Sequence, residues 1–228
     1  MKKETFIISL GGSIIVPDQI DVGFVKDFRK LIISQTKKNR RFVIVTGGGK
    51  VCRRYQGAGA EVRKMSAEER DWIGIYVTQL NSHFMRMCFG KYASEKTVFN
   101  IHKKVKFDEP VIFGAGWEPG TSTDYDAVIL AKQYNAKTIL NLSNIDKVYT
   151  KDPNKYKSAK PIDSISWPDF RKIVGNTFTP GGNYPFDPIA SKKAQKLGLK
   201  VVSMNGNNMP NLKNFFDGKD FVGTVIGD

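Results

Sequence analysis

Short apolar runs alternate with amphipathic segments along most of the chain, and this alternation constrains the fold more than any other feature. Apolar residues recur every three or four positions between the runs, which is typical of helices with one buried face. The runs have the composition of buried parallel strands and cover residues 5–10, 42–46, 97–100, 111–113, 137–141 and 200–204. The predicted helices cover about residues 22–32, 67–89, 124–134 and 188–197. The sequence therefore predicts an α/β fold with a mainly parallel sheet.

One local signal fixes the start of the longest predicted helix. Ser66 is followed three residues later by Glu69, which is a capping-box pattern. No Pro/Ser/Gly-rich linker, internal repeat or low-complexity segment divides the chain. We therefore expect a single domain over residues 1–228.

Composition excludes several classes of protein. The 228 residues are 40% hydrophobic and 25% charged, which is ordinary for a globular protein with a real core. No apolar run approaches the roughly 20 residues of a membrane helix, and no signal-peptide pattern is present, so we expect a cytoplasmic protein. Two cysteines and two histidines argue against a disulfide framework, a histidine metal site and a Ser-His-Asp hydrolase.

The net charge of +14 has three interpretations, namely a nucleic-acid partner, small phosphorylated substrates, or a solvated surface. The lysines are spread along the sequence, and no arginine-rich arm or aromatic RNA-binding motif is present. We therefore expect anionic metabolites rather than nucleic acid. A basic surface without a dedicated partner stays open.

Glycines follow three of the predicted strands. Gly11-Gly12 follows the first run, Gly47-Gly48-Gly49 the second, and Gly114, Gly116 and Gly120 the run at 111–113. Because the carboxyl ends of parallel strands meet at one edge of a sheet, these loops are expected to lie together, where ligands bind. Three glycine loops predict a ligand with several phosphates.

The stretch FVIVTGGGKVCRRY, residues 42–55, is the sharpest of these features. Its glycines let a ligand approach the backbone closely, and a helix starting behind them would present free N–H groups to phosphate. Lys50, Arg53 and Arg54 add positive charge. The stretch is neither the common P-loop nor the dinucleotide fingerprint. A tight turn needed only for packing is the alternative.

Two further stretches carry polar groups at strand ends. In GAGWEPGTSTDYDAVILA, residues 114–131, a Pro-Gly turn leads to three hydroxyl residues that suit a phosphate or the edge of a nucleobase. The alternative there is that Thr123 or Asp124 is simply a helix N-cap. In NLSNIDKVYTKDP, residues 141–153, Tyr149 and Asp152 suit a base and a ribose. An ordinary hairpin is the alternative.

Seven motifs in order resemble the amino acid kinase superfamily, and within it the uridylate (UMP) kinases of archaeal type. They are LGGS, VTGGGK…R, RDWIGIYVTQLN, PGTSTD, SNIDKVYTKDP, FDPIASKKA and the terminal GTVI, and they span nearly the whole chain. The resemblance implies a three-layer α/β/α sandwich, usually assembled as a hexamer. It also implies transfer of the γ-phosphate of ATP to UMP, giving ADP and UDP for pyrimidine nucleotide biosynthesis.

The resemblance also assigns residues to two substrates, with UMP mainly on the N-terminal part and ATP mainly on the C-terminal part. The implied ATP-binding residues are Gly12, Ser13, Gly49, Arg53, Ser143, Asn144, Tyr149 and Asp152. The implied UMP-binding residues are Gly48, Asp71, Trp117, Glu118, Pro119, Gly120, Thr121, Ser122 and Thr123. Lys192, Arg53 and Lys50 are the expected catalytic cations. Mg²⁺ is expected to arrive on the ATP phosphates rather than in a protein metal site.

The chain departs from the superfamily at Ser9, where many members carry a lysine aimed at the ATP phosphates. The archaeal uridylate kinases also lack that lysine and commonly carry an aspartate there, so its absence points to that branch. Lys50, Arg53 and Lys192 are the candidates to supply the missing charge. Asp187 is interpreted as a helix-start or organising residue.

Two other functions stay open. The same fold could phosphorylate another small anion such as isopentenyl phosphate, although neither His83 nor His102 lies in a glycine loop to serve that acceptor. A non-catalytic nucleotide-binding or storage protein is the second alternative.

Overall fold

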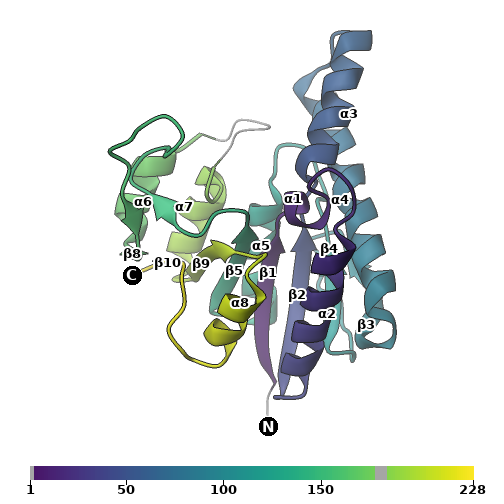
Figure 1. The fold of residues 1–228 in the computed structure, drawn as a ribbon. Helices are drawn as coiled ribbons and strands as arrows, with labels where there is room; N and C mark the ends of the chain where they lie inside the picture. Colours follow the sequence, from purple (N-terminus) through teal and green to yellow (C-terminus); the bar gives the residue numbers. More distant parts are fainter. Residues whose placement is uncertain (1–2, 178–183) are drawn as a thin grey trace.

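A mixed eight-stranded sheet runs through the molecule, whose computed structural model describes residues 3–177 and 184–228 (Figure 1). The strands in spatial order are β3 (Ala93–Val98), β4 (Val111–Gly114), β2 (Arg40–Thr46), β1 (Glu4–Leu10), β5 (Thr138–Ser143), β9 (Lys200–Asn205), β10 (Thr224–Ile226) and β8 (Ser164–Ile165). All neighbouring pairs are parallel except β9 and β10. The six strands from β3 to β9 therefore share one edge at their carboxyl ends, as the sequence predicts, whereas β10 and β8 run in the opposite direction.

Helices cover both faces of this sheet and complete a three-layer α/β/α sandwich. One face carries α1 (Gly12–Ile15), α2 (Val22–Thr36), α4 (Ala67–Phe89) and α8 (Met209–Phe216), whose apolar residues join one core cluster with β1 and β2. The other face carries α5 (Thr123–Tyr134), α6 (Trp167–Val174) and α7 (Pro188–Lys196), which form the second cluster. Strands buried on both faces explain why β1, β2 and β5 are continuous apolar runs.

One helix, α3 (Gly49–Val62), contributes no buried residue to either cluster. It contacts α4, and the two helices rise together away from the sheet (Figure 1). A separate two-stranded ribbon, β6 (Val148–Tyr149) with β7 (Pro161–Ile162), lies beyond β5. Both features project from the edge of the sheet that carries the glycine loops.

The structure confirms the long helix with its cap and corrects one strand. α4 begins and ends where the periodicity predicts, and Ser66 and Glu69 form the capping box through both of its hydrogen bonds. The strand predicted at 97–100 is wrong, because β3 spans Ala93–Val98. β3 lies at the edge of the sheet and carries polar residues, so its apolar pattern is weak.

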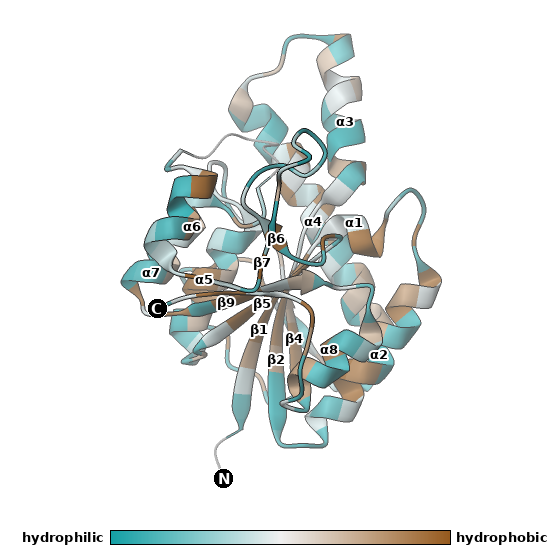
Figure 2. Ribbon diagram, turned by 60° about the vertical axis from the view of Figure 1, so that its left-hand side comes forward, coloured by the Kyte–Doolittle hydropathy of each residue, from teal (hydrophilic) through white to brown (hydrophobic). Residues whose placement is uncertain are grey.

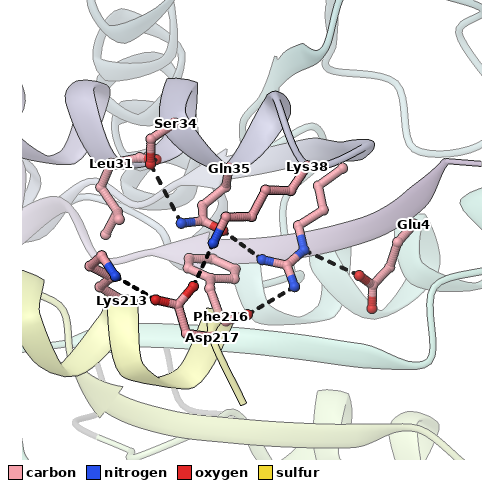
Figure 3. Close-up of polar contacts among 9 residues, drawn as sticks. Glu4, Leu31, Ser34, Gln35, Lys38, Lys213, Phe216 and Asp217 are labelled. Atoms are coloured by element: carbon pink, nitrogen blue, oxygen red, sulfur yellow. Dashed lines mark hydrogen bonds and ion pairs between the residues drawn. The ribbon is translucent and has the colours of Figure 1, made fainter. Parts of the chain in front are cut away.

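A polar network joins the end of α2 to the end of α8 at the opposite end of the sheet (Figure 3). The Asp217 carboxylate accepts hydrogen bonds from Lys38 on one side and Lys213 on the other. Arg40 donates to the Gln35 side chain at 2.5 Å and to the Phe216 carbonyl at 2.8 Å. These contacts fix the ends of α2 and α8 against the start of β2. They lie at the end of the sheet away from the glycine loops.

Hydrophobic residues gather in the central strands, and hydrophilic residues lie on the outer surfaces of the helices (Figure 2). The central strands are hydrophobic, whereas the amino-terminal ends of β1 and β2 are hydrophilic. Among residues 3–177 and 184–228, none of the helices combines the length and the apolar character that a membrane span requires.

Candidate active site

The first two glycine loops are in direct backbone contact. β1 and β2 are neighbours, and Gly47 N donates to the Leu10 carbonyl at 2.8 Å. A Cβ on Gly12 would overlap the Gly47 carbonyl and come within 2.5 Å of Gly49 N. Gly49 itself has a φ of +60°, which residues with side chains rarely adopt. Both glycines are therefore required by the close approach of the two loops.

Helix α3 begins directly at the triple glycine. Gly48 is its N-cap, and no side chain of the described residues caps it. The free N–H groups and the positive dipole end of the helix therefore face the loop, which makes this turn suitable for phosphate.

The cations expected on α3 lie in its first two turns. Lys50 Nζ is 3.5 Å from Asp18 Oδ1, and Arg54 Nη2 is 2.8 Å from the same oxygen. Arg53 is exposed and forms no ion pair with the described residues. Lys50 and Arg53 are the two expected catalytic cations on α3. Arg53 is available to bind a phosphate, whereas Lys50 lies beside Asp18.

The loop after β4, residues 116–122, is held to α4 by three hydrogen bonds. Gly120 N donates to Asp71 Oδ2 at 2.9 Å, and Gln79 Nε2 donates to the Gly116 carbonyl at 3.2 Å. Gly116 N also donates to Thr78 Oγ1 at 3.0 Å. Asp71, which the sequence assigns to the UMP side, is thereby brought to the predicted loop from 49 residues away.

The N-cap of α5 is Ser122, one residue before Thr123, the first of the two residues that the sequence offers as a cap. Neither Thr123 nor Asp124 is the N-cap, because Ser122 Oγ accepts from Tyr125 N at 3.2 Å. Asp124 is left free for a different role.

That role is to join three elements that meet at the centre of the edge. Ser9 Oγ, on β1, donates to Asp124 Oδ1 at 2.8 Å. Asp187 N, at the start of α7, donates to Asp124 Oδ2 at 3.1 Å. Burial raises the pKa of Asp124 to about 6, although both hydrogen bonds favour the carboxylate. Sequence reasoning missed this network because Ser9 and Asp124 are 115 residues apart.

Asp187 confirms its expected part as a helix-start residue. Its Oδ1 accepts from Ala190 N at 2.6 Å and caps α7. Burial raises the pKa of this carboxylate too. α7 carries Lys192, which is exposed and lies in the middle of the helix. The link from Asp124 to Asp187 therefore fixes the helix that carries the expected catalytic lysine.

The residues expected on the ATP side lie on the other side of β1 from the 116–122 loop. β5 ends at Ser143, and Asn144 follows it as an exposed residue. Tyr149 is in β6, and Asp152 holds the turn after it, with Oδ1 accepting from Asn154 N at 2.9 Å. The structure thus separates the two predicted groups of residues, with the glycine loops between them.

One histidine lies beside the 116–122 loop although it is not part of it. His102 Nε2 is 3.2 Å from Glu118 Oε1. The pair lines a cavity of about 230 Å³ that extends to Ser122 and Asp187. Asp126 lies near Glu118, and both its oxygens are buried without a hydrogen-bond partner among the described residues. Burial and the neighbouring Glu118 hold the pKa of Asp126 well above its usual value.

Chemically, this edge offers anion binding rather than nucleophilic attack. It combines close-packed glycine backbone, an uncapped helix start and mobile cations on α3 and α7. Such groups stabilise charge on phosphoryl oxygens. Two groups of polar residues flank them, which is the arrangement needed to hold a donor and an acceptor on either side.

Comparisons with known proteins agree with this geometry. A model of the amino acid kinase family matches residues 4–205. The uridylate kinase of Thermoplasma volcanium is 33% identical over 98% of this chain and 97% of its own. That of Methanobrevibacter smithii is 32% identical over 96% and 97%. The crystal structure of uridylate kinase from Archaeoglobus fulgidus superimposes with a TM-score of 0.83 at 29% identity and covers both chains fully.

Proposed function

The chain belongs to the amino acid kinase family, and on that premise we propose that it transfers the γ-phosphoryl group of ATP to UMP, giving ADP and UDP. The relatives named uridylate kinase match it over nearly the whole length of both chains. The product belongs to pyrimidine nucleotide biosynthesis. One observation carries the proposal for the site: the two glycine loops touch, with separate groups of polar residues on either side.

This geometry suits phosphoryl transfer because the reaction asks the protein mainly for positioning and for stabilisation of charge. The γ-phosphoryl group would lie over the contact between Gly12 and Gly49. Free N–H groups of α3 would face its oxygens. The UMP phosphate is already a competent nucleophile at neutral pH, so the proposal needs no general base.

The proposed donor side uses mainly the C-terminal part of the proposed single domain, together with the glycine loops of the N-terminal part. Gly12, Ser13 and Gly49 would hold the ATP phosphates. The adenosine would lie against the end of β5 and the β6–β7 ribbon, held by Ser143, Asn144, Tyr149 and Asp152.

The proposed acceptor side uses the N-terminal part. Gly48 would contact the UMP phosphate, and Asp71 Oδ1, which accepts no hydrogen bond from the described residues, would accept from the ribose hydroxyls. The loop from Trp117 to Thr123 would enclose the uracil and the phosphate.

Two cations are the proposed catalytic groups. Arg53 is on α3 and Lys192 is on α7, and each would neutralise charge that builds up on the transferring group. Lys50 is a weaker candidate because Asp18 lies beside it.

Mg²⁺ is proposed to arrive with ATP. Both oxygens of Asp124 already accept hydrogen bonds, and the described residues contain no cluster of three or more acidic, histidine or cysteine side chains placed to hold a metal. This donor set does not fit a dedicated magnesium cage, so no step is assigned to the ion.

One observation favours a second acceptor. His102 lies beside Glu118 of the 116–122 loop, although it is far from any glycine loop in sequence. A histidine there is the feature expected of an isopentenyl phosphate kinase, so isopentenyl phosphate is the alternative acceptor to test.

We also propose a homo-oligomer, with α4 as its interface. Trp72, Tyr76, Leu80 and Met87 form an exposed apolar stripe along that helix. Three of these side chains are 66% exposed, which is costly for a lone chain in water. A second copy is the proposed occupant, as part of a hexamer, and the cytoplasm is the proposed location.

A coupled ADP-release assay tests the reaction. ATP, Mg²⁺ and the enzyme are mixed with UMP, CMP, AMP or isopentenyl phosphate in turn. Turnover with UMP and little with CMP or AMP is expected. Turnover only with isopentenyl phosphate would move the assignment to the second acceptor. Binding of ATP by calorimetry without turnover of any acceptor would instead support a nucleotide sensor or storage protein.

A further inference from the structure

Three lysines that are far apart in the sequence come together at the end of the sheet opposite the glycine loops, and three more lie on the segment that runs from His102 toward them. We call these six the basic edge: Lys3, Lys103, Lys104, Lys106, Lys137 and Lys200. All six are exposed, and none forms an ion pair with the described residues. In the sequence, the spread of the lysines argues against a nucleic-acid partner. The fold brings these lysines near one another, so that argument no longer applies.

Three of these lysines lie at the amino ends of adjacent strands. Lys3 precedes β1, Lys137 precedes β5, and Lys200 begins β9. Lys200 N donates to the Lys137 carbonyl at 3.0 Å, so their backbones are neighbours. Because strands in a sheet lie about 4.8 Å apart, the row spans roughly 10 Å.

The other three lysines are on a segment anchored beside this row. Tyr134, at the end of α5, donates from its hydroxyl to the Val105 carbonyl at 2.7 Å. Lys104 Nζ lies 5.4 Å from the centre of the Tyr134 ring. Arg41 donates to the Phe107 carbonyl and lies 4.0 Å over its ring. The segment is thus held against both α5 and β2 by side-chain contacts.

A hollow lies at the amino ends of β1 and β5, beside the end of α5. It has a volume of about 360 Å³, and its lining includes Lys3, Tyr134 and Lys137. The hollow therefore brings the side chain of Tyr134 together with Lys3 and Lys137, and Glu4 also lines it. A base turned out of a single strand could stack there while its phosphates meet the lysines.

Charge at this end of the molecule is strongly unbalanced. The segments 3–6, 40–41, 103–109, 132–138 and 198–200 carry nine lysines and arginines against three carboxylates. One of those carboxylates, Glu4, is 3.3 Å from Arg40 Nε and is thereby neutralised. The cations are spread over several strands and a loop rather than arranged around one point. That distribution fits a chain of phosphates better than a single small anion.

We propose that the basic edge binds the phosphate backbone of single-stranded nucleic acid. Lys3, Lys137 and Lys200 lie at the opposite end of the strands from the proposed kinase site, so the inference goes beyond the proposed function and does not depend on it.

The test uses the full-length protein and a fluorescein-labelled single-stranded RNA of about 20 nucleotides. Fluorescence anisotropy measures the dissociation constant at several salt concentrations. Lys104→Glu/Lys137→Glu is compared with Lys26→Glu/Lys30→Glu, which changes the net charge equally on α2, on the other face of the sheet. UMP kinase activity and the melting temperature are measured for both variants.

The first variant is expected to bind RNA at least about tenfold more weakly. Its salt slope should fall by about 1.4, because each phosphate contact on a single strand contributes about 0.7. The control should lose less than about threefold, and both variants should keep kinase activity. Equal losses in the two variants, tighter binding of a duplex of the same length, or no RNA binding by the wild type would overturn the proposal. Absence of UMP kinase activity in the wild type would contradict the proposed function and leave the RNA-binding proposal unchanged.

Discussion

Asp71 Oδ2 accepts a hydrogen bond from Gly120 N at 2.9 Å, and this contact joins helix α4 to the loop proposed to enclose UMP. The same carboxylate is proposed to bind the ribose through Oδ1. Ribose binding and the position of the loop are therefore linked through one side chain. Gly120 is exposed and has a φ of +82°, so the contact depends on a backbone conformation that glycine favours.

The two functions of Asp71 can be separated by substitution. Asp71→Asn keeps an acceptor for Gly120 N but turns an amide donor toward the ribose, so KM for UMP should rise about 10- to 100-fold with a smaller change in kcat. Asp71→Ala removes both contacts and should lower kcat as well. Steady-state kinetics with varied UMP measures both constants. Identical kinetics in the two variants would show that the contact with Gly120 has no part in turnover.

Lys192 is predicted to matter far more for the reaction than Ser9. Lys192→Ala should lower kcat at least about 100-fold, because it removes a cation from the transferring phosphoryl group. Ser9→Ala should change kcat by less than about threefold, since Ser9 acts only as a donor to Asp124. Single-turnover rates at saturating ATP and UMP provide the comparison.

Lys196→Ala is the matched control for this prediction, because Lys196 is exposed near the end of the same helix. Its activity should stay close to that of the wild type. If Ser9→Ala and Lys192→Ala proved equally active, the charge assigned to Lys192 would have to come from another residue.

How far the sequence predicts this molecule depends on how local each signal is. The cap at Ser66 and the period of α4 are local, and both are confirmed. The glycine loops are also predicted correctly at one edge, because parallel strands bring their carboxyl ends together. β3 was misplaced because an edge strand with polar residues lacks a continuous apolar run.

Contacts between distant segments leave no such signal. Ser9 meets Asp124 across 115 positions, and His102 meets Glu118 across 16 positions that include strand β4. The six lysines of the basic edge come from four separate segments. Only the strand order brings these groups together, and a single sequence does not determine that order.

The stability of the fold should depend on the ionisation of Asp124. Its pKa is about 6 in the folded protein because of burial, against an ordinary value of 3.8. A raised carboxyl pKa stabilises the fold below about pH 4, and that contribution is lost as the pH rises through about 6. Between about pH 4 and pH 6, the free energy of unfolding of the wild type should fall by up to about 3 kcal/mol relative to that of Asp124→Asn, whose side chain does not titrate.

Urea unfolding of both proteins at pH 4 to 8 measures this difference. The asparagine oxygen can still accept from Asp187 N, and its amide can donate to Ser9 Oγ, so the fold should be kept. Parallel pH profiles for the two proteins would contradict the raised pKa.

Close contact of the two glycine loops predicts a strong effect of one methyl group. Gly12→Ala would drive Cβ into the Gly47 carbonyl, so the loops must separate. Unfolding free energy should fall by about 2 kcal/mol or more, and kinase activity should be lost with it. Gly57→Ala is the control, because no atom lies within 4 Å of its added Cβ and it is inside α3. It should be neutral or more stable by up to about 1 kcal/mol, as thermal unfolding can determine.

The apolar stripe on α4 predicts how the protein assembles. Leu80 is 66% exposed in the single chain and lies one turn from Tyr76, so burial against a second copy removes both from water. Leu80→Asp should place a charge in that interface and yield a smaller particle by light scattering coupled to size-exclusion chromatography. Val222→Asp, which changes an exposed apolar residue outside α4, should leave the particle size unchanged. If the wild type stays monomeric even at the highest protein concentration measured, the stripe is not an interface between copies, because two exposed stripes would then fail to associate.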